Sequence, residues 1–600
     1  MAGPMLPTHP DDTIIGQAYD ARLMKRMLNY LKPYKLQLAL AVALLLAGTG
    51  VELVSPLIVK HGIDNYVAVK RISGLGWVAL LLTGALVLGV VLRFFQVYLT
   101  SWIGERVVQN LRVQLFDHLQ RLPLGLLDSR PIGWWMTRVT NDVQTLNEMF
   151  STVVVSVFGD LLALAGIVTV LLILNWKLAL VTFTVLPLLI WAVTLFRSRV
   201  RRTFRIIREA LAKLNGFMQE HISGVRTVQV FNRIDTSFEQ FKIHNADFRS
   251  AYIQAIRYYA LFFPVVTFLL ALSTALILLT GGKMILGAAL TWGGLVAFLQ
   301  YAERFFRPIR DLAERYNTMQ AAMAAAERVF WLLDSKQESR LPTDDRGRVA
   351  AAMQTQGEII FDHLEFAYKT GETVLKDVSF TVEPGTTVAI VGATGAGKTT
   401  LISLLLRFWE LNEGRILLDG KDIGKWNLSE LRQAFGVVLQ DTFLFSGSIA
   451  ENVTLGELSR GGEVLQRALT EANAMSFVER LPNFIDEPVG ERGAQISVGE
   501  RQLLAIARAI AASPSVMLLD EATAAIDTET EIKIQSALER LMRGRTTLVI
   551  AHRLSTIRKA DKIVVLHKGR VRETGTHAQL LALDGIYARL YRLQFASAAA

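Results

Sequence analysis

A glycine-rich segment that ends in lysine and threonine carries the clearest chemical signal in this chain. Residues 392–399 read Gly-Ala-Thr-Gly-Ala-Gly-Lys-Thr, directly after the apolar run 387–391 and before an apolar helical run. Glycines let backbone N–H groups turn toward phosphate oxygens at a helix N-terminus, where a lysine adds a cation and a threonine a Mg²⁺ ligand. A chance glycine turn would lack this strand and helix context. The segment predicts a nucleoside triphosphate site formed by Gly392, Ala393, Thr394, Gly395, Ala396, Gly397, Lys398, Thr399 and Thr400.

Two adjacent acids form a second candidate site. Asp520 and Glu521 follow the apolar run 516–519, which has the pattern of a buried strand. Asp520 is placed to hold Mg²⁺ through its water shell, and Glu521, on the opposite side of the strand, to polarise an attacking water. Acids at a strand end also cap helices. The glycine-rich loop in the same chain favours the catalytic interpretation.

Composition separates the chain into two unlike parts, and its 600 residues predict several domains. Residues 36–308 are dominated by Leu, Val, Ala and Phe, whereas charged residues return at ordinary globular density from Gly357 onward. The formal charge of +10 reflects basic residues beside apolar runs, a feature of membrane topology rather than of nucleic-acid binding. The chain contains no cysteine, so disulfides, thiolate metal ligands and cysteine nucleophiles are excluded.

The apolar part predicts six membrane spans of about 20 residues each. They lie at 36–59, 76–99, 152–174, 177–196, 258–280 and 286–308. The third and fourth spans are separated only by Asn175 and Trp176, whereas about 50 and about 60 residues follow the second and fourth spans, too many for ordinary loops. We expect these long insertions to be helical extensions into the cytosol. Basic residues before the first span predict cytoplasmic termini, and the amphipathic run Arg22–Tyr34 is expected to lie along the membrane surface.

The predicted fold is a multidomain membrane protein, with an all-α six-helix transmembrane domain and an α/β P-loop ATPase domain. We expect a leader at 1–20 without a cleavable signal, a transmembrane domain at 21–334, a linker at 335–356 and a nucleotide-binding domain at 357–600. Several charged residues lie in or near the predicted spans and are candidates to line a cavity, although such residues also snorkel or form structural pairs. They are Glu52, Arg93, Asp160, Glu303, Arg304 and Arg307.

The segment Ile496–Gln502, read Ile-Ser-Val-Gly-Glu-Arg-Gln, resembles the signature sequence Leu-Ser-Gly-Gly-Gln of ATP-binding cassette (ABC) proteins. Over its whole length the chain resembles an ABC exporter half-transporter, and especially those of heterodimeric multidrug exporters. The resemblance implies ATP and Mg²⁺ as cofactors and ATP hydrolysis that drives drugs, lipids or peptides outward from the cytoplasmic side. It implies a second half-transporter and the lipid bilayer as partners, no nucleic acid, and the bacterial plasma (inner) membrane as the location.

The resemblance also suggests roles for single residues. Tyr368 matches the aromatic residue that stacks on adenine, although a lone tyrosine is more often part of a core. Glu491 resembles the exporter-specific X-loop, and Pro131–Arg138 and Gln219–Arg226 resemble intracellular coupling segments. The remaining matches are Gln440 as the Q-loop glutamine that senses Mg²⁺, Asp527 as the D-loop aspartate, His552 as the switch histidine at the γ-phosphate, and Ser497 and Gly499 as nucleotide-contacting signature residues.

The signature segment departs from the family pattern at two positions. Val498 replaces a glycine where backbone should approach phosphate, and Glu500 replaces glutamine and adds negative charge. The ATP site that this segment helps to build is expected to hydrolyse poorly, whereas the chain's own P-loop side looks complete. This mismatch predicts a non-identical partner with an intact signature and a degenerate catalytic acid. A homodimeric lipid flippase and a nucleotide-gated channel or receptor remain alternatives.

Overall fold

The computed structural model describes residues 20–338, 355–368, 371–456, 462–520, 527–551 and 554–595. Within them the chain forms two compact units. One comprises residues 20–117 and Gly133–Asp334, and the other comprises His118–Ile132 and the residues from Ser335 onward. The predicted leader, most of the predicted linker, Glu521 and His552 lie outside the described residues.

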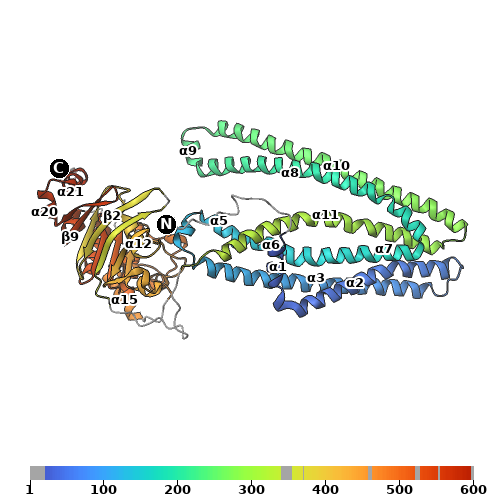
Figure 1. The fold of residues 1–600 in the computed structure, drawn as a ribbon, viewed down its shortest axis with the longest axis horizontal. Coiled ribbons are helices and arrows are strands. Elements are labelled where there is room, and N and C mark those ends of the chain that lie inside the picture. The colour runs from blue at the N-terminus through green and yellow to red at the C-terminus, as the bar shows by residue number, and fades with distance from the viewer. Residues whose placement is uncertain are drawn as a thin grey trace. The chain divides into compact units, whose positions relative to one another are not determined.

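The first unit is built from long helices, several of which extend well beyond the thickness of a bilayer (Figure 1). The amphipathic run before the first span forms α1 and a short 3₁₀ turn, Lys32–Tyr34. Its helices are α1 Ala21–Asn29, α2 Lys35–Gly62, α3 Leu75–Leu119, α5 Ile132–Thr137, α6 Val143–Glu148, α7 Val154–Phe183, α8 Leu186–Ser223, α9 Val225–Val230, α10 Ile234–Leu286 and α11 Trp292–Asp334.

Four helical segments among the described residues are long and apolar enough to cross a membrane: Lys32–Val67, Leu75–Leu119, Val157–Phe183 and Ile234–Leu286. The most apolar stretch of α3 has no buried residue, which would be costly in water but suits contact with lipid. The predicted fourth span is divided between α7, which leaves helical geometry at Asn175, and the start of α8. The predicted sixth span, in α11, contains Glu303, Arg304 and Arg307. The number of six spans therefore stays a prediction.

Small residues and one buried ion pair hold this unit together. At Gly159 and Gly166 of α7, a Cβ atom would come within 2.9 and 2.5 Å of the leucine side chains of α2, so glycine permits this close helix contact. Asp142, which is 5% exposed, accepts hydrogen bonds from Nε and Nη2 of Arg328 at 2.9 and 2.6 Å. This bidentate pair fixes the segment between α5 and α6 to α11.

Helices α8 and α10 pack side by side into a long two-helix arm that is joined at its tip by α9 (Figure 1). The arm corresponds to the predicted helical extension between the fourth and fifth spans. Its tip exposes large apolar side chains, including Val230 and Phe231, which are 73% and 70% exposed. Such exposure at the end of a helical arm is typical of a contact surface.

The second unit contains an α/β domain with two sheets. The larger sheet has the order β10-β9-β3-β8-β7-β6, parallel except for β10, and the smaller antiparallel sheet has the order β2-β1-β4-β5. The strands are β1 Ile359–Ala367, β2 Thr373–Val382, β3 Thr387–Val391, β4 Glu413–Leu418, β5 Lys421–Asp422, β6 Phe435–Val438, β7 Val516–Asp520, β8 Thr546–Ile550, β9 Lys562–His567 and β10 Arg570–Gly575. The helices are α4 Leu124–Asp128, α12 Lys398–Leu405, α13 Leu428–Gln433, α14 Ile449–Thr454, α15 Gly462–Glu471, α16 Met475–Val478, α17 Val498–Ala512, α18 Thr528–Met542, α19 Leu554–Lys559, α20 His577–Ala582 and α21 Ile586–Phe595.

The larger sheet is buried on both faces, which explains the continuous apolar runs of its strands. Successive residues of β3 alternate between two cores: Val388 and Ile390 belong to one, Ala389 and Val391 to the other. The first core is shared with the smaller sheet and α12, and the second with α14, α15, α17 and α18. Because both faces are covered, the carboxyl ends of the parallel strands are the accessible edge for a functional site.

The segment His118–Ile132, which the sequence places within the transmembrane domain, belongs to the unit of the α/β domain. Its backbone carbonyl at Arg121 accepts a hydrogen bond from the N–H of Glu338 at 2.9 Å. Glu338 in turn accepts hydrogen bonds from Arg432 of α13 at 2.9 and 3.0 Å. These contacts connect the segment after α3 to the α/β domain through residues far apart in sequence.

Candidate functional site

The glycine-rich loop connects β3 to α12 as the sequence predicts, and its backbone requires glycine. Gly395 and Gly397 have φ of +78° and +99°, values that side chains disfavour. At Gly392 a Cβ atom would lie 2.2 Å from the carbonyl oxygen of Leu566. Lys398, the first residue of α12, is 7% exposed and donates hydrogen bonds to the carbonyl oxygens of Gly392 and Ala393 at 2.8 and 3.1 Å. The lysine is therefore held inside the loop that would surround a phosphate chain.

Three predicted site residues lie at or just after the carboxyl ends of parallel strands of the larger sheet. Lys398 follows β3, Asp520 ends β7, and Gln440 comes two residues after β6. Burial lowers the pKa of the Lys398 ammonium, and the negative charge of Asp520 opposes that shift. Asp520 is 9% exposed, whereas Gln440 is exposed to solvent. Glu521 and His552 follow β7 and β8 in the sequence, and their positions lie outside the described residues.

Tyr368 lies beside the loop, as expected for a residue that contacts the base. Its hydroxyl donates a hydrogen bond to Oγ1 of Thr400 in α12 at 3.0 Å, and its ring packs edge-to-face against Phe366 and Trp409. The side chain is 40% exposed, so part of the ring remains accessible. A pre-positioned aromatic face next to a phosphate loop is suited to stack on a nucleobase.

The signature segment forms the N-terminus of α17, with Ser497 as the N-cap residue. The Ser497 hydroxyl accepts a hydrogen bond from the backbone N–H of Glu500 at 3.3 Å and donates one to Oε2 of Glu500 at 2.7 Å. The same carboxylate accepts a hydrogen bond from the Ser497 N–H at 3.1 Å. Val498 is 52% exposed beside them, and Gly499 is buried. The altered residue Glu500 thus places a carboxylate at the helix end that favours anions, where it competes with phosphate.

The residues around the signature segment connect it to two other predicted motifs. Arg501 donates hydrogen bonds from Nη1 to the carbonyl oxygens of Gly493 and Ile496, both at 3.0 Å, and so joins α17 to the turn Glu491–Gly493 of the X-loop. Asp527 is the N-cap of α18, and its Oδ2 accepts a hydrogen bond from the N–H of Thr530 at 2.9 Å. That hydrogen bond lowers the pKa of the Asp527 carboxyl.

Trp409 is a residue that the sequence did not indicate. Its ring contacts Tyr368, with ring centroids 4.9 Å apart, and it also lies against α4. A Cβ atom at Gly125 of α4 would be 2.6 Å from Cζ3 of this ring. One tryptophan therefore touches both the predicted adenine-binding residue and the helix that follows α3. The resemblance indicated a coupling segment at Pro131–Arg138, and the helix in contact with the α/β domain begins earlier, at Leu124.

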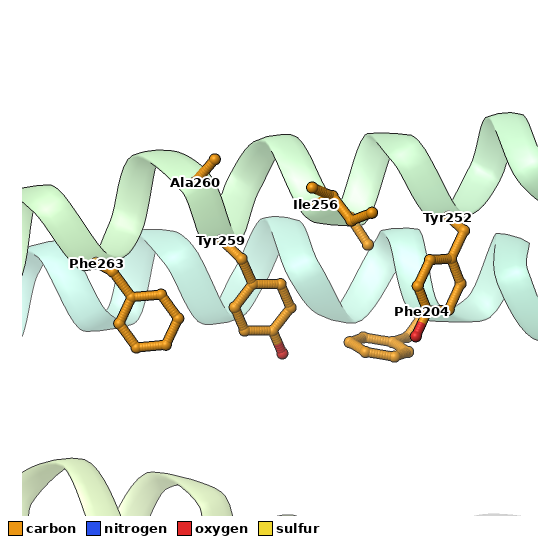
Figure 2. A pocket seen from close by; sticks show the side chains of 7 residues that line it. Phe204, Tyr252, Ile256, Tyr259, Ala260 and Phe263 are labelled. Atoms are coloured by element: carbon orange, nitrogen blue, oxygen red, sulfur yellow. The ribbon is translucent and has the colours of Figure 1, made fainter.

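A hollow of about 390 Å³ lies between α8 and α10 of the two-helix arm. Figure 2 shows Tyr252, Tyr259 and Phe263 of α10 with their rings on the same side as Phe204 of α8. Its remaining lining residues are Ala255, Ile256 and Ala260. The hollow is mainly apolar and aromatic, which suits hydrocarbon or ring systems.

Comparison with known proteins agrees with this architecture. Residues 38–309 match the model of the ABC transporter transmembrane region, and residues 375–524 match that of the ABC transporter domain. An uncharacterized ABC transporter ATP-binding protein of Bacillus subtilis is 38% identical over 95% of this chain and 94% of its own. A putative multidrug export ATP-binding/permease protein of Bacillus subtilis is 34% identical, with 95% and 99% covered. An ATP-dependent lipid A-core flippase of Thiobacillus denitrificans is 35% identical, with 96% and 98% covered. The chain has a helical transmembrane region followed by a P-loop α/β domain, and these relatives match it over nearly its full length. This chain therefore belongs to the ABC transporter family, as an ATP-hydrolysing exporter with a cytoplasmic ATPase domain.

Proposed function

We propose that this chain is the hydrolysing subunit of a heterodimeric exporter in the bacterial plasma membrane. It moves hydrophobic or amphipathic molecules, such as drugs, lipids or peptides, from the cytoplasmic side outward. The two-helix arm and the apolar hollow on it support a dimer that handles apolar molecules, since both present unpaired apolar surface. ATP binding closes two cassettes against each other, and hydrolysis returns the transporter to its inward-facing state.

The proposal of a heterodimer rests on the difference between the P-loop side and the signature side of this chain's ATPase domain. On the P-loop side, the backbone of Gly392–Lys398 and the buried Asp520 have the form that phosphate and Mg²⁺ binding require. On the signature side, the Glu500 carboxylate accepts a hydrogen bond from the Ser497 hydroxyl and lies at the N-terminus of α17. In the family each ATP lies between one chain's P-loop and the other chain's signature. The partner is therefore proposed to carry an ordinary signature and a degenerate catalytic acid.

The proposed roles of the site residues follow the family resemblance, supported for the described residues by their positions. Lys398 and the P-loop N–H groups bind the β- and γ-phosphates, and Thr399, Gln440 and Asp520 hold Mg²⁺, the last through water. Glu521 polarises the attacking water, and His552 contacts the γ-phosphate. Tyr368 stacks on adenine, and the residues that face the partner's nucleotide are Ser497, Gly499 and Asp527.

The test is the ATPase rate of the purified complex, made with and without its co-expressed partner. Glu521→Gln is expected to nearly abolish steady-state hydrolysis while ATP-driven closure remains, because an amide nearly preserves shape but accepts no proton. The double change Val498→Gly with Glu500→Gln is the matched control and should alter turnover much less. Full activity from this chain alone, or substantial activity after Glu521→Gln, would contradict the asymmetric assignment.

A homodimeric lipid flippase is the second candidate, and the 35% identity to the lipid A-core flippase favours it. In that case this chain alone would purify as an active dimer in lipid. Native mass spectrometry of the solubilised transporter separates the two: one mass for both subunits supports the homodimer, and two masses support the heterodimer.

A further inference from the structure

The hollow between α8 and α10 begins at the predicted membrane boundary and extends along the two-helix arm. Tyr259, Ala260 and Phe263 lie at the start of the predicted fifth span, and α10 is long and apolar enough to cross a membrane. At the other end of the hollow, Tyr252 of α10 lies beside Phe204 of α8, with the rings on the same side as those of Tyr259 and Phe263 (Figure 2). The hollow therefore runs from the membrane toward the tip of the arm.

The side chains that line the hollow are apolar but open to their surroundings. Those between 39% and 53% exposed are Phe204, Tyr252, Ile256 and Phe263. Phe196 of α8 packs edge-to-face against Tyr259, with ring centroids 5.2 Å apart, and so helps to hold the wall of the hollow in place. Contact with water is unfavourable for this surface, and a hydrocarbon chain would cover it. The volume of about 390 Å³ is within the range of ligand pockets.

Two arginines border the end of the hollow that lies toward the tip of the arm. Arg208 comes four residues after Phe204 on α8, and Arg249 comes three residues before Tyr252 on α10. At this spacing each arginine lies one helical turn beyond the aromatic residue and on the same side of its helix. Both are exposed, and neither side chain has an ion pair or hydrogen bond among the described residues.

Packing between the helices brings the two arginines to the same level of the arm. Ile207 of α8 and Ala251 of α10, which are close in sequence to Arg208 and Arg249, belong to one buried cluster. Two guanidinium groups at one level attract an anion, and their planar forks match the oxygens of a phosphate group. The rule that positive residues flank spans on the cytoplasmic side accounts for arginines here, but it does not account for an aromatic hollow beside them.

We propose that the hollow binds an anionic phospholipid of the cytoplasmic leaflet. The phosphate contacts Arg208 and Arg249, and an acyl chain lies along the aromatic rings toward Phe263 and the predicted span. The order of groups along the arm, cationic and then apolar, matches such a lipid, and basic pockets between helices on this side of a membrane bind anionic head groups. The proposal goes beyond the proposed export function, because the lipid is a bound component of the arm and not cargo.

The arginines of α8 provide a matched pair of charge variants. Arg208→Gln with Arg249→Gln removes two positive charges beside the hollow. Arg199→Gln with Arg202→Gln removes the same charge from two exposed arginines that helical spacing places on the other side of α8 from Phe204. Neither control side chain has a partner among the described residues, so the two double variants differ only in position.

Two exposed alanines of α10 provide a second pair that leaves the charge unchanged. Ala260→Trp fills part of the hollow. Ala246→Trp places the same side chain at an exposed position of the helix that does not line the hollow. The comparison separates loss of the apolar site from the effect of tryptophan on the helix.

The experiment counts the lipids bound to the purified complex by native mass spectrometry, without nucleotide. The complex in detergent is titrated with dioleoylphosphatidylglycerol and with dioleoylphosphatidylcholine, which has the same chains and no net charge. Glycerol phosphate, a head group without chains, is the competitor. We expect one phosphatidylglycerol per copy of this chain to bind about tenfold or more tightly than phosphatidylcholine, and glycerol phosphate not to displace it. Arg208→Gln with Arg249→Gln, and Ala260→Trp alone, should each weaken this binding by about tenfold or more, as loss of charge-assisted contacts or of apolar burial implies.

Both control variants should bind the lipid as the unchanged complex does, and the same spectra show that each variant remains assembled. Equal affinity for the two lipids would overturn the proposal, since charge would not be recognised. Displacement by glycerol phosphate would make the arginines a site for free phosphate. Equal weakening by both arginine pairs would reduce the effect to net charge, and unchanged affinity in Ala260→Trp would place the lipid elsewhere. A complex that binds the lipid as expected but neither hydrolyses ATP nor transports would overturn the export function and leave the lipid site intact.

Discussion

Single side chains divide the nucleotide site into an adenine part and a phosphate part. Tyr368 contributes an accessible ring face, and Lys398 contributes a buried ammonium held by two loop carbonyls. Thr400 of α12 accepts a hydrogen bond from the tyrosine hydroxyl and so links the two parts. The contributions of base stacking and of phosphate binding should therefore be separable by mutation.

Tyr368→Ala is expected to weaken ATP binding about 2- to 12-fold, the equivalent of one aromatic stack of about 0.5–1.5 kcal/mol. Tyr368→Phe, which loses only the bond to Thr400, should stay close to the unchanged affinity. Titration of the complex with ATP and with inorganic triphosphate provides the measurement. Triphosphate affinity should be unaffected by either change, and unchanged ATP affinity in Tyr368→Ala would mean that another aromatic residue holds the base.

Lys398→Ala should weaken both ATP and triphosphate by about 10-fold or more, since hydrogen bonds to a charged group contribute about 1.5–3 kcal/mol each. Lys398→Arg retains the charge but not the compact ammonium and should recover only part of the affinity. The same titrations measure both variants. Loss of ATP affinity with triphosphate affinity retained would contradict the phosphate role.

At the level of elements, α4 provides a physical contact between the chain that leaves α3 and the nucleotide site. Trp409 touches both Gly125 of α4 and Tyr368. A ring that contacts both elements can respond when Tyr368 is drawn onto adenine. We therefore expect this contact to transmit nucleotide occupancy to α4.

Gly125→Val should separate hydrolysis from transport, because its Cβ would overlap the Trp409 ring and overpacking typically costs about 1–3 kcal/mol. ATP affinity is expected to remain, while substrate-dependent stimulation of the ATPase falls. Gly462→Val in α15 is the control, since a Cβ there meets no atom within 4 Å and the residue lies outside the predicted coupling segments. Equal loss of stimulation in both variants would argue against the Trp409 contact.

The ion pair of Asp142 with Arg328 should contribute to stability because its carboxylate is buried. Arg328→Ala leaves that carboxylate with Arg138 at 3.3 Å, so we expect a loss of about 1–3 kcal/mol, below the value for a wholly unpaired buried charge. The exposed pair of Lys242 and Glu239 serves as the comparison, and Lys242→Ala should change stability by less than about 1 kcal/mol. The thermal unfolding midpoint of the complex in detergent measures the change in stability for each variant. Equal midpoints for Arg328→Ala and the unchanged complex would show that Asp142 is accessible to water.

At the level of the whole molecule, the orientation in the membrane can be tested directly. The chain has no cysteine, so each introduced cysteine is a single probe once any cysteine of the partner is replaced. Pro131→Cys and Gly224→Cys should react with an impermeant maleimide only from the cytosolic side, because positive flanks set orientation. Ser73→Cys, in the turn between α2 and α3, should react only from outside. Labelling of Gly224→Cys in intact cells would reverse the assignment.

The sequence alone determined the parts of this protein that depend on local geometry. The strand, loop and helix around Gly392–Thr399 follow from glycine torsions and apolar runs of the right length, and all three have the predicted bounds within a residue or two. The altered signature was also readable, since a serine cap and Glu500 three residues later form a local capping box. Asn175 breaks the helix where the sequence indicated a hairpin.

Tertiary structure decided whatever depends on residues far apart in the chain. No periodicity reveals that Trp409 meets Gly125, or that the segment His118–Ile132 belongs with the ATPase unit, because those contacts join separate elements. The sequence named Glu52, Arg93 and Asp160 singly, and only the packing of α2, α3 and α7 brings them to one pocket together with Gln96, whose type gave no signal. Spacing along one helix fixes which face a side chain occupies, whereas the partner of that face is set by how helices pack.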